Sequence, residues 1–77
     1  MLTGKRFRLE RATLAVDRSD GKRRAVTVPI GEIIKVVSGP TDDNGIVDIL
    51  WEGRIVEMFA IDVDTRGTEI IDRRAGA

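Results

Sequence analysis

Cysteine, histidine and tyrosine are all absent from this chain of 77 residues. Without cysteine, neither a disulfide framework nor a thiolate metal site can form. The usual nucleophile and base pairs of acyl transfer are missing as well, so only carboxylates, lysines and hydroxyls remain for chemistry. A chain of this length also leaves little room for a deep cleft. We therefore expect a protein that is not an enzyme, with no catalytic residue, no metal and no cofactor.

One acidic stretch, residues 62–73, has a partial likeness to a calcium-binding loop. Asp62 and Asp64 stand at the first and third positions of that pattern. Arg66 occupies a later ligand position, and Arg73 stands where the bidentate glutamate belongs, so both would repel the cation. The stretch predicts a turn rather than a metal site.

Net charge and long hydrophobic runs are also lacking. Lysine plus arginine equals aspartate plus glutamate at 13 each, so the chain as a whole has no attraction for nucleic acid or an anionic membrane. No apolar run reaches the roughly 18 residues of a membrane span, and the N-terminal segment lacks the apolar stretch of a signal peptide. We expect a cytoplasmic protein without a membrane partner, built as one domain over residues 1–71 with a flexible tail over 72–77.

What the sequence has is alternation of apolar and other residues, with turn residues between the runs. Asp20-Gly21 and Glu52-Gly53 predict tight turns, and residues 38–45 predict a surface loop. The pattern predicts an all-β protein of five to six short antiparallel strands. The expected strands are 7–16 as one bent strand or two short ones, 24–28 ending at Pro29, 32–37 as a central strand or one covered on both sides, 46–51, 54–60 and 68–71.

Four stretches in this order resemble an SH3-like barrel: "VTVPIGEIIKVV", "SGPTDDNG", "DILWEGRIVEMFAIDV" and "TEII". The resemblance implies a diverging turn, a variable loop, a distal hairpin followed by a one-turn helix, and a closing strand. Bacterial and ribosomal proteins of this architecture bind RNA or partner subunits. Proline-rich peptide binding needs a groove lined by aromatic residues, and one Trp with no Tyr does not supply it.

The last hairpin offers the first candidate site. A two-residue loop at Glu52-Gly53 sets the cross-strand pairs and hence two apolar faces. One face carries Val47, Ile49, Val56 and Met58, with Trp51 at the loop end as a core or rim anchor stacked on Arg54. The other is the candidate partner-binding face, with Ile46, Asp48, Leu50, Ile55, Glu57 and Phe59. One face should line the core, and the other should meet either the rest of the chain or another molecule.

Within that face, Asp48 stands opposite Glu57, and like charges directly across a ladder destabilise it. Some cation should offset them. One possibility is Arg6 or Arg8 of the same chain; the other is a basic side chain from a partner or a second protomer.

A second candidate site is an Arg-rich patch for nucleic acid, which forms if the first hairpin brings two basic clusters together. Its residues are Lys5, Arg6, Arg8, Arg11, Lys22, Arg23 and Arg24. Few aromatic residues are available to stack on bases, and a solvated, salt-bridged surface explains the same pattern. The sequence therefore favours a non-catalytic protein-interaction module or a small subunit of a larger assembly, with self-association or a protein partner, and nucleic-acid binding as the alternative.

Overall fold

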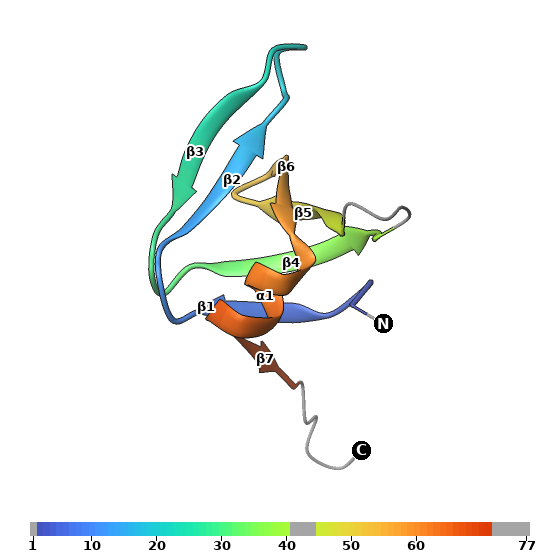
Figure 1. Cartoon of the computed structure of the whole chain (residues 1–77). Helices are drawn as coiled ribbons and strands as arrows, with labels where there is room; N and C mark the ends of the chain where they lie inside the picture. Colours follow the sequence, from blue (N-terminus) through green and yellow to red (C-terminus); the bar gives the residue numbers. More distant parts are fainter. Residues whose placement is uncertain (1, 41–44, 72–77) are drawn as a thin grey trace.

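The computed structural model describes residues 2–40 and 45–71, which form one antiparallel sheet and one short helix. The sheet has seven strands in the order β3-β2-β6-β5-β4-β1-β7 (Figure 1). The elements are β1 (Arg6–Leu9), β2 (Thr13–Asp17), β3 (Arg24–Val28), β4 (Ile33–Ser38), β5 (Ile46–Trp51), β6 (Arg54–Phe59), α1 (Ala60–Arg66) and β7 (Gly67–Ile70).

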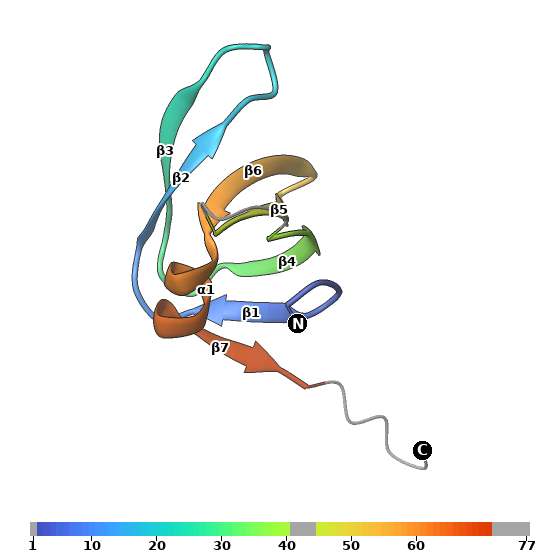
Figure 2. The same ribbon diagram turned by 45° about the vertical axis from the view of Figure 1, so that its right-hand side comes forward.

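The sheet curls strongly, as the two views of Figures 1 and 2 show, with the β2–β3 hairpin reaching away from β1 and β7. Its end strands are β3 and β7, and within the described residues no pairing joins them. The prediction of a small all-β antiparallel protein is confirmed. The predicted number of strands was too low, because the first alternating stretch forms two strands, β1 and β2, separated by a bend at Glu10 and Arg11.

Several strand boundaries agree with the turn chemistry. Strand β3 ends at Val28, directly before Pro29, because proline has no N–H to give to a ladder. Gly21 lies in the β2–β3 turn with a φ of 73°. In the β5–β6 turn, Glu52 and Gly53 have φ values of 51° and 76°. Two successive positive φ angles are the geometry of the tight hairpin turn predicted there.

The helix α1 is the element that the residue pattern missed and that the resemblance implied. Its sequence AIDVDTR is rich in β-branched residues, which are mediocre helix formers. Val63 is fully buried against the core, and the Ala60 N–H donates to the Gly45 carbonyl over 2.7 Å. A helix of seven residues is too short to be stable alone, so these tertiary contacts hold it in place.

The core is one small apolar cluster enclosed by the curled sheet and capped by α1. Strand β4 lies inside the sheet order between β5 and β1, as predicted. Of the two alternatives, the central position is therefore the one that holds, and β4 is not covered on both sides, because Ile33 and Val37 are 48% and 36% exposed. The buried apolar residues are Phe7, Leu9, Ala15, Val28, Ile34, Val36, Val47, Ile49, Trp51, Val56, Met58 and Val63.

The predicted tail, residues 72–77, and the middle of the predicted loop, residues 41–44, lie outside the described residues. In the part of the chain that the structure describes, no helix has the length and apolar character needed to cross a membrane.

Candidate functional site

The β5–β6 hairpin has one buried face and one exposed face. The predicted cross-strand pairs are all present, from Val47 opposite Met58 to Trp51 opposite Arg54. The inner face belongs to the core, with Ile49 and Val56 at 0% exposure. On the other side, Leu50, Ile55 and Phe59 are 39%, 45% and 51% exposed. We call this side the outer face, consisting of Ile46, Asp48, Leu50, Ile55, Glu57 and Phe59.

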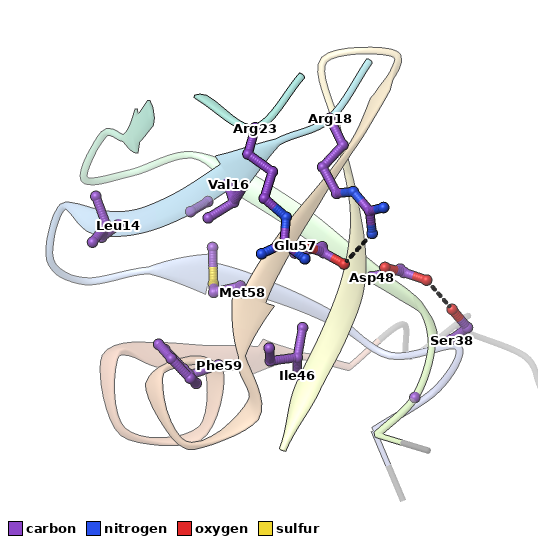
Figure 3. Close-up of a pocket in the computed structure, with 12 residues that line it drawn as sticks. Leu14, Val16, Arg18, Arg23, Ser38, Ile46, Asp48, Glu57, Met58 and Phe59 are labelled. Atoms are coloured by element: carbon purple, nitrogen blue, oxygen red, sulfur yellow. Dashed lines mark hydrogen bonds and ion pairs between the residues drawn. The ribbon is translucent and has the colours of Figure 1, made fainter. Parts of the chain in front are cut away.

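A groove of about 530 Å³ opens beside the outer face (Figure 3). Strand β2 pairs with β6 at only two positions, Val16 with Glu57 and Asp17 with Val56. The N-terminal part of β2 therefore diverges from β6, and the groove lies between them. Its apolar lining comes from Leu14, Ala15, Val16, Ile46, Met58 and Phe59, and its other residues are Arg18, Arg23, Ser38, Gly39, Asp48 and Glu57. Sequence reasoning did not find this groove, because it depends on the contact of β2 with β6, two strands far apart in the chain.

The Asp48/Glu57 pair is offset by residues that were not predicted. The Arg18 Nη1 group donates to Glu57 Oε2 over 3.0 Å, and the Ser38 hydroxyl donates to Asp48 Oδ2 over 2.7 Å (Figure 3). The prediction of Arg6 or Arg8 is wrong, because β1 is separated from β5 by β4. Arg18 directly follows β2, and only the β2–β6 pairing brings it to Glu57.

At the loop end of the hairpin, Trp51 is a rim anchor, as predicted. It is 7% exposed, and its indole N–H donates to Glu32 Oε1 over 2.8 Å. The Arg54 guanidinium carbon lies 4.8 Å from the centroid of the indole, a cation–π distance. Trp51 is therefore held on its face and on its edge, and it is not displayed as a ligand platform.

Arg54 also connects this rim to Asp17, a carboxylate that is 6% exposed. The Arg54 Nη1 group donates to Asp17 Oδ2 over 2.9 Å, and the Ser19 backbone N–H donates to Asp17 Oδ1 over 2.8 Å. The hydrogen bonds from Ser19, together with the charges of Arg54 and Arg24, lower the pKa of Asp17 below its ordinary value of 3.8. Asp17 is thus a satisfied buried anion with a structural role.

The structure does not bring the two basic clusters together. Arg6 and Arg8 lie on β1, whereas Lys22 and Arg23 lie in the turn between β2 and β3. Strands β2 and β1 are separated in the sheet by β6, β5 and β4, and Figure 1 shows the turn and β1 at different ends of the molecule. The single patch of seven cations therefore does not form. Nucleic-acid binding stays a prediction that would have to use one of the two clusters alone.

In the described ranges, no group of three or more acidic side chains is placed to hold a metal ion, and Asp62 and Asp64 lie in α1 rather than in a loop. Comparison with protein-family models, with curated proteins and with solved structures gives no significant match to this chain. The proposal below therefore rests on the residues of the outer face and the groove alone.

Proposed function

We propose that this protein is a non-catalytic protein-interaction module of the cytoplasm, with an SH3-like arrangement, that binds a protein partner through the outer face and the adjoining groove. The observation that carries the proposal is the exposure of Leu50, Ile55 and Phe59 on an ordered hairpin whose other face is fully packed. Exposed apolar side chains that cluster beside a groove mark interaction surfaces more often than isolated ones do.

The composition of the groove supports a protein partner. Its apolar part includes the exposed side chains of Leu14 and Phe59, and its charged part contains both signs, with Arg18 and Arg23 facing Asp48 and Glu57 (Figure 3). Protein interfaces commonly have an apolar centre within a polar rim. A nucleic acid would meet two carboxylates at this surface, so the chemistry favours a polypeptide.

The order of the elements supports the SH3-like arrangement. A long hairpin of β2 and β3 precedes the central strand β4, the β5–β6 hairpin follows, and a short helix leads into β7 beside β1. This is the succession that the four sequence stretches implied. Architecture alone does not select a ligand, so the proposed activity rests on the exposed face.

The test is capture of partners from a nuclease-treated native lysate of the source organism, with matched surface variants. Phe59→Ser removes an exposed aromatic from the groove, and Ile61→Ser removes a comparably exposed apolar side chain, 68% exposed, that does not line the groove. We expect one set of captured proteins to be retained by the parent chain and by Ile61→Ser and to be lost with Phe59→Ser.

Melting temperatures of both variants should stay near that of the parent chain, since both side chains are exposed. Capture that is unaffected by Phe59→Ser would reject the groove as the contact surface. Capture that disappears with nuclease treatment in all forms would instead support nucleic-acid binding by one of the basic clusters.

A further inference from the structure

Two like-charge cross-strand pairs flank one apolar pair on the same side of the sheet. Lys35 on β4 lies opposite Arg6 on the neighbouring strand β1. It also lies opposite Leu50 on the other neighbouring strand, β5. Leu50 in turn lies opposite Ile55 on β6. Asp48 precedes Leu50 by two residues and therefore points to the same side as Leu50. A basic zone, an apolar zone and an acidic zone are thus contiguous.

Each like-charge pair is locally unfavourable. Residues directly opposite in an antiparallel pair repel when their charges have the same sign. On the acidic side, Arg18 offsets the charge of Glu57, whereas among the described residues Asp48 accepts only from the neutral Ser38 hydroxyl. On the basic side, the described residues supply no ion pair to Arg6 or Lys35, while the neighbouring Lys5 pairs with Glu69 at 3.8 Å. Within the described residues, the sheet therefore presents charges of both signs without an ion pair on either side of an apolar centre.

We propose that this face binds a second copy of the same chain in a two-fold symmetric dimer, with Leu50 packed on its counterpart, Ile55 beside this contact, and Lys35 of each protomer paired with Asp48 of the other. The proposal deepens the function proposed above and rests on it in that both require the outer face to be free in the monomer. A two-fold interface must be self-complementary, and a surface with adjacent basic and acidic zones around an apolar centre meets that condition.

The geometry of the sheet allows the paired contacts. Neighbouring strands lie about 4.8 Å apart, and alternate residues on one strand lie about 6.8 Å apart. Lys35 is therefore displaced from Leu50 by about 4.8 Å across the sheet, and Asp48 by about 6.8 Å along β5, a difference of about 2 Å that the flexible lysine side chain can span. A two-fold axis in the plane of contact, passing over Leu50 on the diagonal between these directions, places each Lys35 over the partner's Asp48. The strands of the two protomers then cross at a steep angle.

The size of the molecule is consistent with such a contact. A specific interface commonly covers about 800 Å² on each partner, which is roughly one seventh of the 5399 Å² of accessible surface of this chain. A domain this small also has a thin core, and association buries apolar surface that the monomer leaves exposed.

The decisive experiment is a charge exchange between two separately purified variants, Lys35→Asp and Asp48→Lys. Association is measured by sedimentation at rising protein concentration and low salt. Each variant alone would set like charges against each other at both contacts, so we expect its dissociation constant to rise at least about tenfold. In the mixture, the two introduced side chains would meet at one contact and the native Lys35 and Asp48 would meet at the other. A heterodimer should therefore form with an affinity close to that of the parent homodimer.

Matched controls are Lys22→Asp, in the distant β2–β3 turn, and Asp64→Lys, on the exposed side of α1. Both make the same charge changes away from the face, and both should leave the association unchanged. Lys35→Asp and Asp48→Lys each convert a like-charge cross-strand pair into an opposite-charge pair. We therefore expect both variants to melt at or above the temperature of the parent monomer, which excludes misfolding as the cause of lost association.

A parent chain that stays monomeric at all concentrations overturns the proposal, and so does a parent dimer that the mixed variants fail to restore. These outcomes are separable from failure of the proposed function. If the chain is always monomeric and captures another protein in a way that depends on Phe59, the proposed interaction function is supported and the dimer is rejected. A dimer that passes the charge exchange, with no other protein captured, would leave self-association as the sole activity of the face.

Discussion

The inner and outer faces of the β5–β6 hairpin are made by the same two strands but differ in burial and in the kind of cross-strand pair that they contain. Inside, Val47 lies opposite Met58 and Ile49 lies opposite Val56, and these four side chains are at most 2% exposed. Outside, the middle of the hairpin has Asp48 opposite Glu57. The inner pairs gain from burial, whereas the outer pair sets two like charges opposite each other, which Arg18 and Ser38 offset in part.

Packing within the monomer therefore accounts for the composition of the inner face only. Alternation needs nothing more than polar or small residues on the solvent side, and Thr or opposite charges would satisfy it better than a like-charge pair. An outer face that is both apolar at its ends and repulsive at its centre is not optimised for the monomer. The contact outside the monomer proposed above would account for such a surface, since proteins tolerate local conflicts where they bind.

The largest expected difference between the two faces is in stability, when one aliphatic side chain is removed from each. Ile49→Ala should lower the free energy of unfolding by about 2–5 kcal/mol, because it leaves a cavity in the core. The neighbouring change Leu50→Ala should cost less than about 0.5 kcal/mol at concentrations where the chain is monomeric. Urea unfolding of both variants measures the contrast, and equal losses would show that the outer face is also packed within the monomer.

A second test concerns the rim, where the inner face ends. Trp51→Phe removes the indole N–H that Glu32 accepts over 2.8 Å and part of the surface on which Arg54 stacks. We expect a loss of about 1–3 kcal/mol in the free energy of unfolding. Phe59→Leu on the outer face is the matched aromatic change and should be nearly neutral. Comparable destabilisation by both variants would contradict the assignment of Trp51 as an anchor.

Acid should weaken the fold through Asp17, on the inner side of the sheet. Hydrogen bonds from Ser19 and the nearby Arg54 lower the pKa of Asp17 in the folded state. A carboxylate with a lowered native pKa stabilises the fold fully above its unfolded pKa, and this contribution is lost as the pH falls through the native value. Stability measured by denaturant should therefore decline below about pH 4. Asp17→Asn should flatten this decline, and an unchanged profile would show that other carboxylates cause it.

The smallest expected effect is a gain. Asp48→Asn keeps an acceptor for the Ser38 hydroxyl and removes one of the two facing negative charges, so the monomer should become more stable by about 0.2–1 kcal/mol. Association should weaken in the same variant. Thermal melting and sedimentation on one sample separate the two effects, and a fall in melting temperature with unchanged association would refute the role assigned to Asp48.

Local sequence was sufficient for the hairpin and insufficient for the contacts that build the site. The Glu52-Gly53 turn sets the register of β5 with β6, since both residues adopt positive φ, and period-two alternation then assigns every side chain to a face. Pro29 similarly marks the end of β3. These features depend on neighbours in the chain, which a single sequence displays.

Arg18 and the groove depend on the pairing of β2 with β6, whose residues are about forty positions apart, and no local pattern specifies that partner. The same is true of the two basic clusters, whose separation follows from the strand order. Helix α1 was missed from its residues because its stability comes from the burial of Val63 rather than from propensity.

The position of β1 between β4 and β7 has a consequence for how the chain folds. The β5–β6 hairpin joins neighbouring segments and can form within microseconds. Strand β1 instead pairs with β7, and this pairing places Arg6 opposite Ile70, a residue near the other end of the chain. It can form only after β7 has been synthesised. Contacts between such distant segments slow folding, because the intervening chain must first be ordered. During synthesis, β1 leaves the ribosome before the other described strands, yet its pairing with β7 is completed late, and until then its edge is open to pairing with other chains.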